Sequence, residues 1–298
     1  MATLKAYLGV ARAPFLALPP TLIAAGAAAA AYEGAFSWTR TVIALVGLVA
    51  LHAAVNILNE VGDMRSGIDL ATRPTPFSGG SKTLPSGAMS VGAARALGLA
   101  CAAAGGAIGL WFLLKVGWIL LPLLVIGAVA VLGYTNFLAR AGLGEVFAGL
   151  GLGALPVWGT SLVQGGIPAP PSYAAALPAF FMTFNLLLLN EFPDEAADRA
   201  GGRRNLVNLL GRRAAAAVWA LAALAVPLVI LLAVARRTLP PACLAAVLPS
   251  LLLIKPLVWA FTSPEAPVPI PALGANVAWN LATNSVLAAA LAVAVALE

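Results

Sequence analysis

The chain has 298 residues, of which 61% are hydrophobic and 9% are charged, and its mean hydropathy is +0.97. Soluble domains carry about 25% charged residues, so this composition excludes a soluble protein and indicates a polytopic membrane protein. The formal net charge of +6 is then explained by membrane topology and by anionic headgroups or substrates. We therefore expect no nucleic-acid partner.

Apolar stretches of spanning length follow one another along the sequence. Since a spanning helix needs roughly 20 apolar residues, we predict nine spans, at about 14–32, 41–61, 92–114, 118–138, 146–163, 174–191, 214–235, 243–261 and 272–297. The basic start before the first stretch would also suit a cleaved signal peptide, but the eight spans that follow favour a membrane span. Two polar loops, at about 62–91 and 192–213, are candidate caps over a site.

Basic residues fall mostly on one side of this predicted topology. With the N-terminus inside, thirteen of them lie at cytoplasmic ends, namely Lys5, Arg12, Arg65, Arg73, Lys82, Arg95, Arg140, Arg199, Arg203, Arg204, Arg212, Arg213 and Lys255. Four lie outside, namely Arg40, Lys115, Arg236 and Arg237. The positive-inside rule thus predicts a multi-pass protein of the cell inner (plasma) membrane, with its N-terminus and both polar loops in the cytoplasm.

Acidic residues are concentrated in two segments, each at the end of an apolar stretch. Seven of the 11 Asp and Glu residues lie there: Glu60, Asp63, Asp69, Glu191, Asp194, Glu195 and Asp198. Residues three or four apart share a helix face. We therefore predict two polar stripes, one of His52, Asn56, Asn59 and Asp63, and one of Asn190, Asp194 and Asp198.

Carboxylates in membrane-embedded segments are costly and normally mark ion, proton or substrate sites. Carboxylate and amide oxygens, without Cys or clustered His, favour a hard cation such as Mg²⁺. Arg residues beside both segments would serve no purpose at a bare cation site. They are explained if the ion carries a diphosphate whose remaining charge needs donors.

These segments resemble the motifs of the UbiA superfamily of intramembrane aromatic prenyltransferases. The N-x-x-N-D-x-x-D type motif after the family's second helix is matched by Asn56, Asn59, Asp63 and Asp69, and the D-x-x-x-D motif after its sixth helix by Asp194 and Asp198. Glu60 stands where the family usually has Asp. Within the family, Gly67-x-Asp69 and the run at 202–211 are most similar to the 1,4-dihydroxy-2-naphthoate prenyltransferases of menaquinone biosynthesis.

The resemblance implies an all-α bundle of about nine transmembrane helices around a central cavity, in a single membrane domain at 1–298. It also implies Mg²⁺-dependent transfer of a prenyl group from a polyprenyl diphosphate to an aromatic acceptor. The implied metal ligands are Asn59, Glu60, Asp63, Asp194 and Asp198, of which Asn59, Asp63, Asp194 and Asp198 are also the expected catalytic residues. The implied diphosphate-binding residues are Arg65, Lys82, Tyr134, Arg140, Arg203 and Arg204.

Several polar residues inside predicted spans are candidates for lining the cavity and meeting the acceptor: His52, Asn56, Asn190 and Asn280. A lone His within a span is more often a hydrogen-bonded packing residue, and Asn276, Asn280 and Asn284 would also suit interhelical hydrogen bonding. The glycines at 105–106 and 149–153 suggest close helix packing.

Two other functions remain open on the sequence. A cation- or proton-coupled transporter would also use intramembrane Asp, Asn and His, although such sites tend to lie near the bilayer midplane. A related transferase could use 4-hydroxybenzoate, homogentisate or a glycerol-phosphate lipid as its acceptor.

Overall fold

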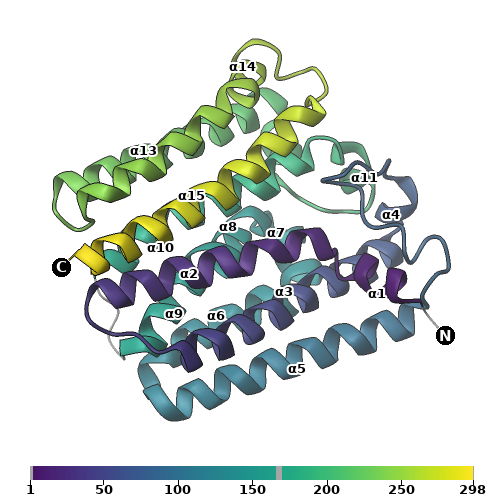
Figure 1. Cartoon of the computed structure of the whole chain (residues 1–298). Helices are drawn as coiled ribbons and strands as arrows, with labels where there is room; N and C mark the ends of the chain where they lie inside the picture. Colours follow the sequence, from purple (N-terminus) through teal and green to yellow (C-terminus); the bar gives the residue numbers. More distant parts are fainter. Residues whose placement is uncertain (1–2, 166–169, 298) are drawn as a thin grey trace.

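The computed structural model describes residues 3–165 and 170–297, which form helices and connecting loops with no strand among them. Eight helices in these ranges are long and apolar enough to cross a membrane, or nine if a bent pair counts as one span. The prediction of an all-α polytopic membrane protein is therefore confirmed (Figure 1).

Most spans are long helices, and the others are assembled from shorter pieces. The long helices are α2 (Leu18–Tyr32), α3 (Trp38–Ser66), α5 (Val91–Val116), α10 (Pro170–Glu191), α13 (Arg212–Ala235) and α15 (Ile270–Leu297). The composite spans are η2 (Trp118–Leu120) with α6 (Leu121–Leu132), α8 (Gly144–Gly149) with η4 (Leu150–Ala154) and α9 (Leu155–Gly165), and η5 (Pro241–Leu253) with α14 (Ile254–Thr262). The remaining short helices are α1 (Leu4–Val10), η1 (Ala13–Ala17), α4 (Ile68–Ala71), η3 (Tyr134–Leu138), α7 (Ala139–Ala141), α11 (Glu195–Ala200) and α12 (Leu206–Leu210).

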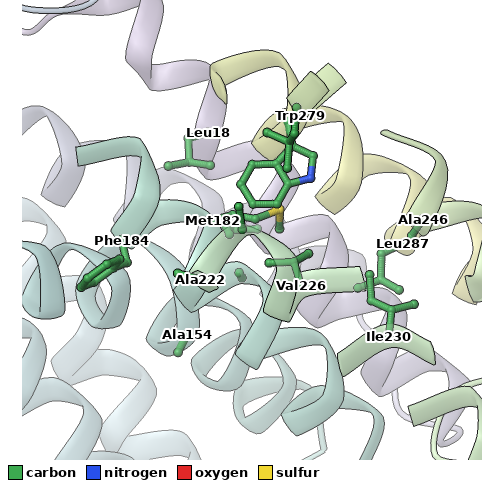
Figure 2. Packing of buried hydrophobic residues seen from close by; sticks show 14 of the residues in the cluster. Leu18, Ala154, Met182, Phe184, Ala222, Val226, Ile230, Ala246, Trp279 and Leu287 are labelled. Atoms are coloured by element: carbon green, nitrogen blue, oxygen red, sulfur yellow. The ribbon is translucent and has the colours of Figure 1, made fainter. Parts of the chain in front are cut away.

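The main apolar core lies where α2, α10, α13 and α15 pack together. Figure 2 shows Met182 of α10, Val226 and Ile230 of α13, and Trp279 and Leu287 of α15 in this core, and all five are fully buried. Helix α2 contributes an alanine-rich surface, which lets its neighbours approach closely. The first apolar stretch is thus an integral part of the bundle.

One end of the bundle carries the N-terminus and the short helices α1, α4 and α11, whereas the C-terminus lies at the opposite end (Figure 1). We call the end that carries the N-terminus, α1, α4 and α11 the capped end. The first polar loop begins later than predicted, because α3 continues to Ser66 and ends at Gly67, whose φ of 81° is a left-handed conformation suited to glycine. The second polar loop is partly helical, since it contains α11 and α12.

The fourth predicted span is not a straight helix. Its chain bends by 69° between Trp118–Leu132 and Tyr134–Ala141. At this break the backbone N–H groups of both Phe137 and Leu138 donate to the carbonyl of Gly133, so the helical ladder widens for one turn. Such a bulge redirects a helix, so the span predicted at 118–138 is a bent pair of helices, which brings the count within the described residues to nine if the pair is one span.

The glycines singled out in the sequence differ in their surroundings. A Cβ on Gly153 would lie 2.5 Å from the carbonyl oxygen of Ala179, and a Cβ on Gly105 would meet Leu51. Both positions therefore permit close helix packing, as predicted. Gly106 has no atom within 4 Å of the equivalent point, so the packing interpretation was wrong there.

We predict that Gly153→Ala lowers the melting temperature of the detergent-solubilised protein, because backbone of α10 stands where the methyl group would go and overpacking costs about 1–3 kcal/mol. The matched change Gly106→Ala should leave the melting temperature unchanged or raise it, since alanine favours helix by ~1 kcal/mol. Thermal denaturation of the two variants in parallel checks this, and equal melting temperatures would contradict the packing account.

Candidate functional site

A pocket of about 220 Å³ opens between α3, α10 and α15 near the capped end. Eleven residues singled out in the sequence motifs or as site candidates line it: His52, Asn56, Asn59, Asp63, Asp69, Tyr134, Asn190, Asp194, Asp198, Arg203 and Asn280. Its acidic and basic groups come from the capped end, and its remaining wall is largely apolar, with Leu48, Leu51, Val131, Leu152 and Leu186 among its residues. The pocket therefore has a charged part and an apolar part.

The first polar stripe lies on one face of α3, as its spacing predicts, and all four of its residues line the pocket. The Asn59 side-chain amide donates to Asp63 Oδ2 at 2.9 Å, and Thr135 Oγ1 donates to Asn59 Oδ1 at 3.4 Å. Asn56 donates instead to the carbonyl of Ala11 at 3.0 Å, which ties α3 to the N-terminal segment.

The second acidic segment is not a single helical stripe, and that prediction was wrong. Helix α10 ends at Glu191, and Asp194 precedes α11, in which Asp198 lies. Pro193 occupies the turn between the two helices, in keeping with its inability to continue a helical ladder. Asn190, Asp194 and Asp198 nevertheless line the same pocket, one from α10, one from the turn and one from α11.

Arg203 joins the two acidic segments. It pairs with Asp63 of α3 and with Asp198 of α11, the latter at 3.4 Å, and it donates to Asn59 Oδ1 at 3.0 Å. Burial alone would lower the pKa of Arg203, but the charges of Asp63 and Asp198 outweigh it and raise the pKa. The guanidinium therefore stays charged between these carboxylates.

A second link joins the two polar loops directly. The backbone N–H of Gly79 in the first loop donates to Asp194 Oδ2 in the second at 3.0 Å. Within the second loop, the Asn205 amide donates to Asp198 Oδ2 at 2.9 Å. Gly80 packs so closely against Asp69 that an added Cβ would lie 2.3 Å from Oδ1. The first loop thus closes over the acidic groups of both segments.

Burial makes the carboxylates at the capped end unusually easy to protonate. It raises the pKa of Asp194 to about 6, and it raises the pKa values of Asp69 and Asp198 to about 7. Among the described residues, Asp194 Oδ1, Asp69 Oδ2 and Asn190 Oδ1 have no hydrogen-bond partner. These oxygens are available to a cation, which would favour the charged carboxylates.

The donor set can be compared with what a hard divalent cation requires. Carboxylate and amide oxygens are suitable ligands, yet no three His, Cys, Asp or Glu side chains within the described ranges approach one another closely enough to hold an ion. Mg²⁺ commonly binds through one or two carboxylates completed by water and substrate phosphates. The site fits such a shared ion, and it does not form an all-protein cage.

Arg12 is a pocket residue that sequence reasoning missed. Its Nε donates to Glu60 Oε1 at 2.8 Å, although the two residues are 48 positions apart. Ser81 donates to the same carboxylate through its backbone N–H and its hydroxyl, each at 2.7 Å. Glu60 is therefore fully buried and fully partnered, and it does not line the pocket. The only feature of the sequence that could have pointed to Arg12 is its position, as a basic residue directly before the first predicted span.

Four of the basic residues predicted to bind diphosphate do not line the pocket. Arg65, Arg140 and Arg204 are exposed, and Lys82 Nζ is held by the Thr72 carbonyl at 2.7 Å and by the Asp69 carbonyl. Arg140 follows the bend at Gly133, which carries it away from the pocket wall. Of the predicted donors, only Arg203 and Tyr134 lie on the pocket.

The sequence matches the UbiA prenyltransferase family over residues 17–281, and the chain therefore belongs to this family. It is a prenyltransferase and a multi-pass membrane protein, and the resemblance seen in the sequence is confirmed at this level. No curated protein matches the chain significantly.

Solved structures share the fold at low sequence identity. A UbiA homologue from Aeropyrum pernix K1 in its apo form has a TM-score of 0.71 and 19% identity, covering 94% of this chain and 98% of its own. A UbiA homologue from Archaeoglobus fulgidus bound to GPP and Mg²⁺ has a TM-score of 0.62 and 18% identity, covering 95% and 99%. A structure described as digeranylgeranylglyceryl phosphate synthase has a TM-score of 0.66 and 15% identity, covering 100% of both chains.

We predict that Arg203→Gln lowers the melting temperature in metal-free buffer by roughly 5 °C, because it leaves Asp63 and Asp198 as buried carboxylates without their counter-ion. Arg204→Gln is the matched control, since that neighbouring side chain is exposed. Thermal denaturation after EDTA treatment measures both, and an Arg203 variant as stable as the Arg204 variant would contradict the bridging role.

Proposed function

We propose that this protein, as a single membrane domain, transfers a polyprenyl group from polyprenyl diphosphate to an aromatic acceptor, 1,4-dihydroxy-2-naphthoate, in a Mg²⁺-dependent reaction. The observation that carries the proposal is the meeting of two acidic segments at one end of an otherwise apolar pocket. An arrangement of this kind suits a substrate with an anionic head and a hydrocarbon tail. The A. fulgidus homologue, described as bound to GPP and Mg²⁺, supports the same substrate class.

Asn59, Asp63, Asp194 and Asp198 would hold the metal, together with Asp69, which lies on the pocket and has an unpartnered oxygen. Glu60 is the weakest member of the predicted ligand set, because Arg12 and Ser81 already occupy its oxygens. When bound, Mg²⁺ neutralises charge on the diphosphate and so makes it a better leaving group.

The protein's own residues have three tasks in this reaction. Arg203 and Arg12 supply positive charge at the charged end of the pocket, where they can donate to the diphosphate. The apolar wall accommodates the prenyl chain and excludes water from the reacting carbon. The C–O bond of the allylic diphosphate breaks with its electron pair leaving on the diphosphate, and the ring carbon that bears the carboxylate bonds to the allylic carbon. The carboxylate then departs as CO₂, and the electron pair of the broken C–C bond restores the aromatic ring.

The choice of acceptor depends on the similarity of Gly67-x-Asp69 and of residues 202–211 to the menaquinone-pathway enzymes. Electrostatic attraction of an acidic acceptor by the capped end would serve 4-hydroxybenzoate equally. We further propose that the capped end faces the cytoplasm across the inner (plasma) membrane, as the excess of Lys and Arg there suggests. The position of the acids at this end, beside Arg203, argues against a midplane transporter site.

We predict that EDTA abolishes prenyl transfer and that added Mg²⁺ restores it. Asp63→Asn and Asp194→Asn should each reduce turnover at least ~100-fold, because the substitutions keep the size of the side chain but remove the charge that binds the metal. Glu265→Gln, in the exposed loop before α15, is the control and should retain full activity. The assay follows radiolabelled prenyl diphosphate, and near-normal rates in either Asp variant would contradict the proposed ligand set.

We predict that expression of the protein restores menaquinone in a strain lacking its menaquinone prenyltransferase. The physical reason is that a ring with two hydroxyl groups is electron-rich enough to attack an allylic cation. Extracted quinones are identified by mass spectrometry. The protein could instead restore ubiquinone in a ubiquinone-deficient strain and fail to restore menaquinone. That result would show that the acceptor is 4-hydroxybenzoate, and it would leave the diphosphate mechanism intact.

A further inference from the structure

His52 is the only histidine of the chain, and it lies on the pocket wall well away from the acidic groups. It precedes Asn59 by seven residues on α3, which places it about 10 Å further along the helix axis. Its pocket-lining neighbours on α3 are Leu48, Leu51, Val55 and Asn56, and the Asn56 amide already donates to the Ala11 carbonyl. The imidazole thus lies one helical turn from Asn56, where the wall formed by α3 becomes apolar.

The imidazole makes no hydrogen bond with any described residue. Its Nδ1 is buried without a partner, and the residue as a whole is only 4% exposed. A buried polar group without a partner is costly. If His52 had only a packing role, a hydrogen-bond partner within the bundle would be expected, and the described part of the chain provides none.

Asn190, Asp194 and Asp69 also carry oxygens without a partner, but they lie at the charged end of the pocket. The polar residues nearest to His52 differ from it in this respect. Asn56 and Asn59 on the same stripe are both hydrogen-bonded. Asn280, on α15, donates to Thr183 at 3.4 Å and accepts from Asn284 at 2.8 Å. The interhelical role considered for Asn280 is therefore supported by its contacts, whereas His52 is left for a ligand.

We propose that His52 accepts a hydrogen bond from a ring hydroxyl of the aromatic acceptor, an inference that rests on the proposed function. With the diphosphate held at the charged end, the reacting carbons lie just inside it, and an aromatic diol placed there extends toward His52. The prenyl chain has no hydrogen-bonding group, so it cannot partner the imidazole. A neutral imidazole always has one acceptor nitrogen. Accepting the hydroxyl proton in a hydrogen bond orients the ring and increases its electron density, and no covalent step is assigned to His52.

The test compares His52→Leu, which removes the acceptor nitrogen, with His52→Gln, which keeps a hydrogen-bonding group of similar reach. Val46→Ala is the matched control, because Val46 lies on the same helix, is 56% exposed and does not line the pocket. For each active variant, KM is measured for 1,4-dihydroxy-2-naphthoate and for the prenyl diphosphate. The inhibition constant of naphthalene-2-carboxylate, which lacks both hydroxyls, is measured alongside.

We expect His52→Leu to raise KM for 1,4-dihydroxy-2-naphthoate about tenfold. The inhibition constant of naphthalene-2-carboxylate and KM for the prenyl diphosphate should change less than about twofold, and His52→Gln should recover most of the acceptor affinity. Equal KM values for the acceptor in His52→Leu and Val46→Ala would overturn the assignment, as would equal changes for the acceptor and the hydroxyl-free inhibitor.

The same experiment distinguishes failure of the proposed function from failure of the His52 assignment. If the wild-type protein transfers no prenyl group to any aromatic acceptor, the function itself is refuted. If it prenylates only 4-hydroxybenzoate, the comparison is made between 4-hydroxybenzoate and benzoate. The His52 assignment is then overturned by the same criterion, an equal effect of the substitution on both compounds.

Discussion

The electrostatic contact of Arg203 with Asp63 and Asp198 is the interaction on which the site depends. Buried carboxylates repel one another and are expensive to desolvate, so two acidic segments from opposite halves of the chain would separate without a cation between them. Arg203 supplies that charge in the metal-free protein. Because it lies between α3 and α11, it also holds the second polar loop over the pocket.

With this contact in place, the pocket has a charged part and an apolar part. Charged groups are confined to the capped end, where loops from both halves of the sequence meet through Gly79 and Asp194. The rest of the wall is apolar and continuous with the helix bundle. A substrate with a diphosphate head and a prenyl tail can match both parts at once, and a reactive allylic centre between them is shielded from bulk water.

Local sequence patterns predicted the fold class and one half of the site. The stripe from His52 to Asp63 was predictable because α3 is one uninterrupted helix, so residue spacing alone decides which side chains share a face. The second segment did not obey the same rule, because Pro193 divides it into the end of α10 and the start of α11. Across such a turn, the three- or four-residue spacing of a helix no longer predicts which side chains share a face.

Contacts between distant residues could not be predicted at all. Arg12 pairs with Glu60 across 48 positions, and no periodicity links the two, so Arg12 looked like a topological charge and Glu60 like a free ligand. Arg140 was expected on the pocket for a different reason, since its assignment assumed a straight helix and the chain bends by 69° before it.

The central claim is that the two acidic segments form one metal and diphosphate site. It is tested most directly by the affinity of a non-reactive prenyl thiolodiphosphate, measured by calorimetry with and without Mg²⁺ for wild type, Asp63→Asn, Asp198→Asn and the double variant. One shared site predicts Mg²⁺-dependent binding, with the double variant hardly weaker than either single variant. Binding that is independent of Mg²⁺, or losses that simply add in the double variant, would contradict the account.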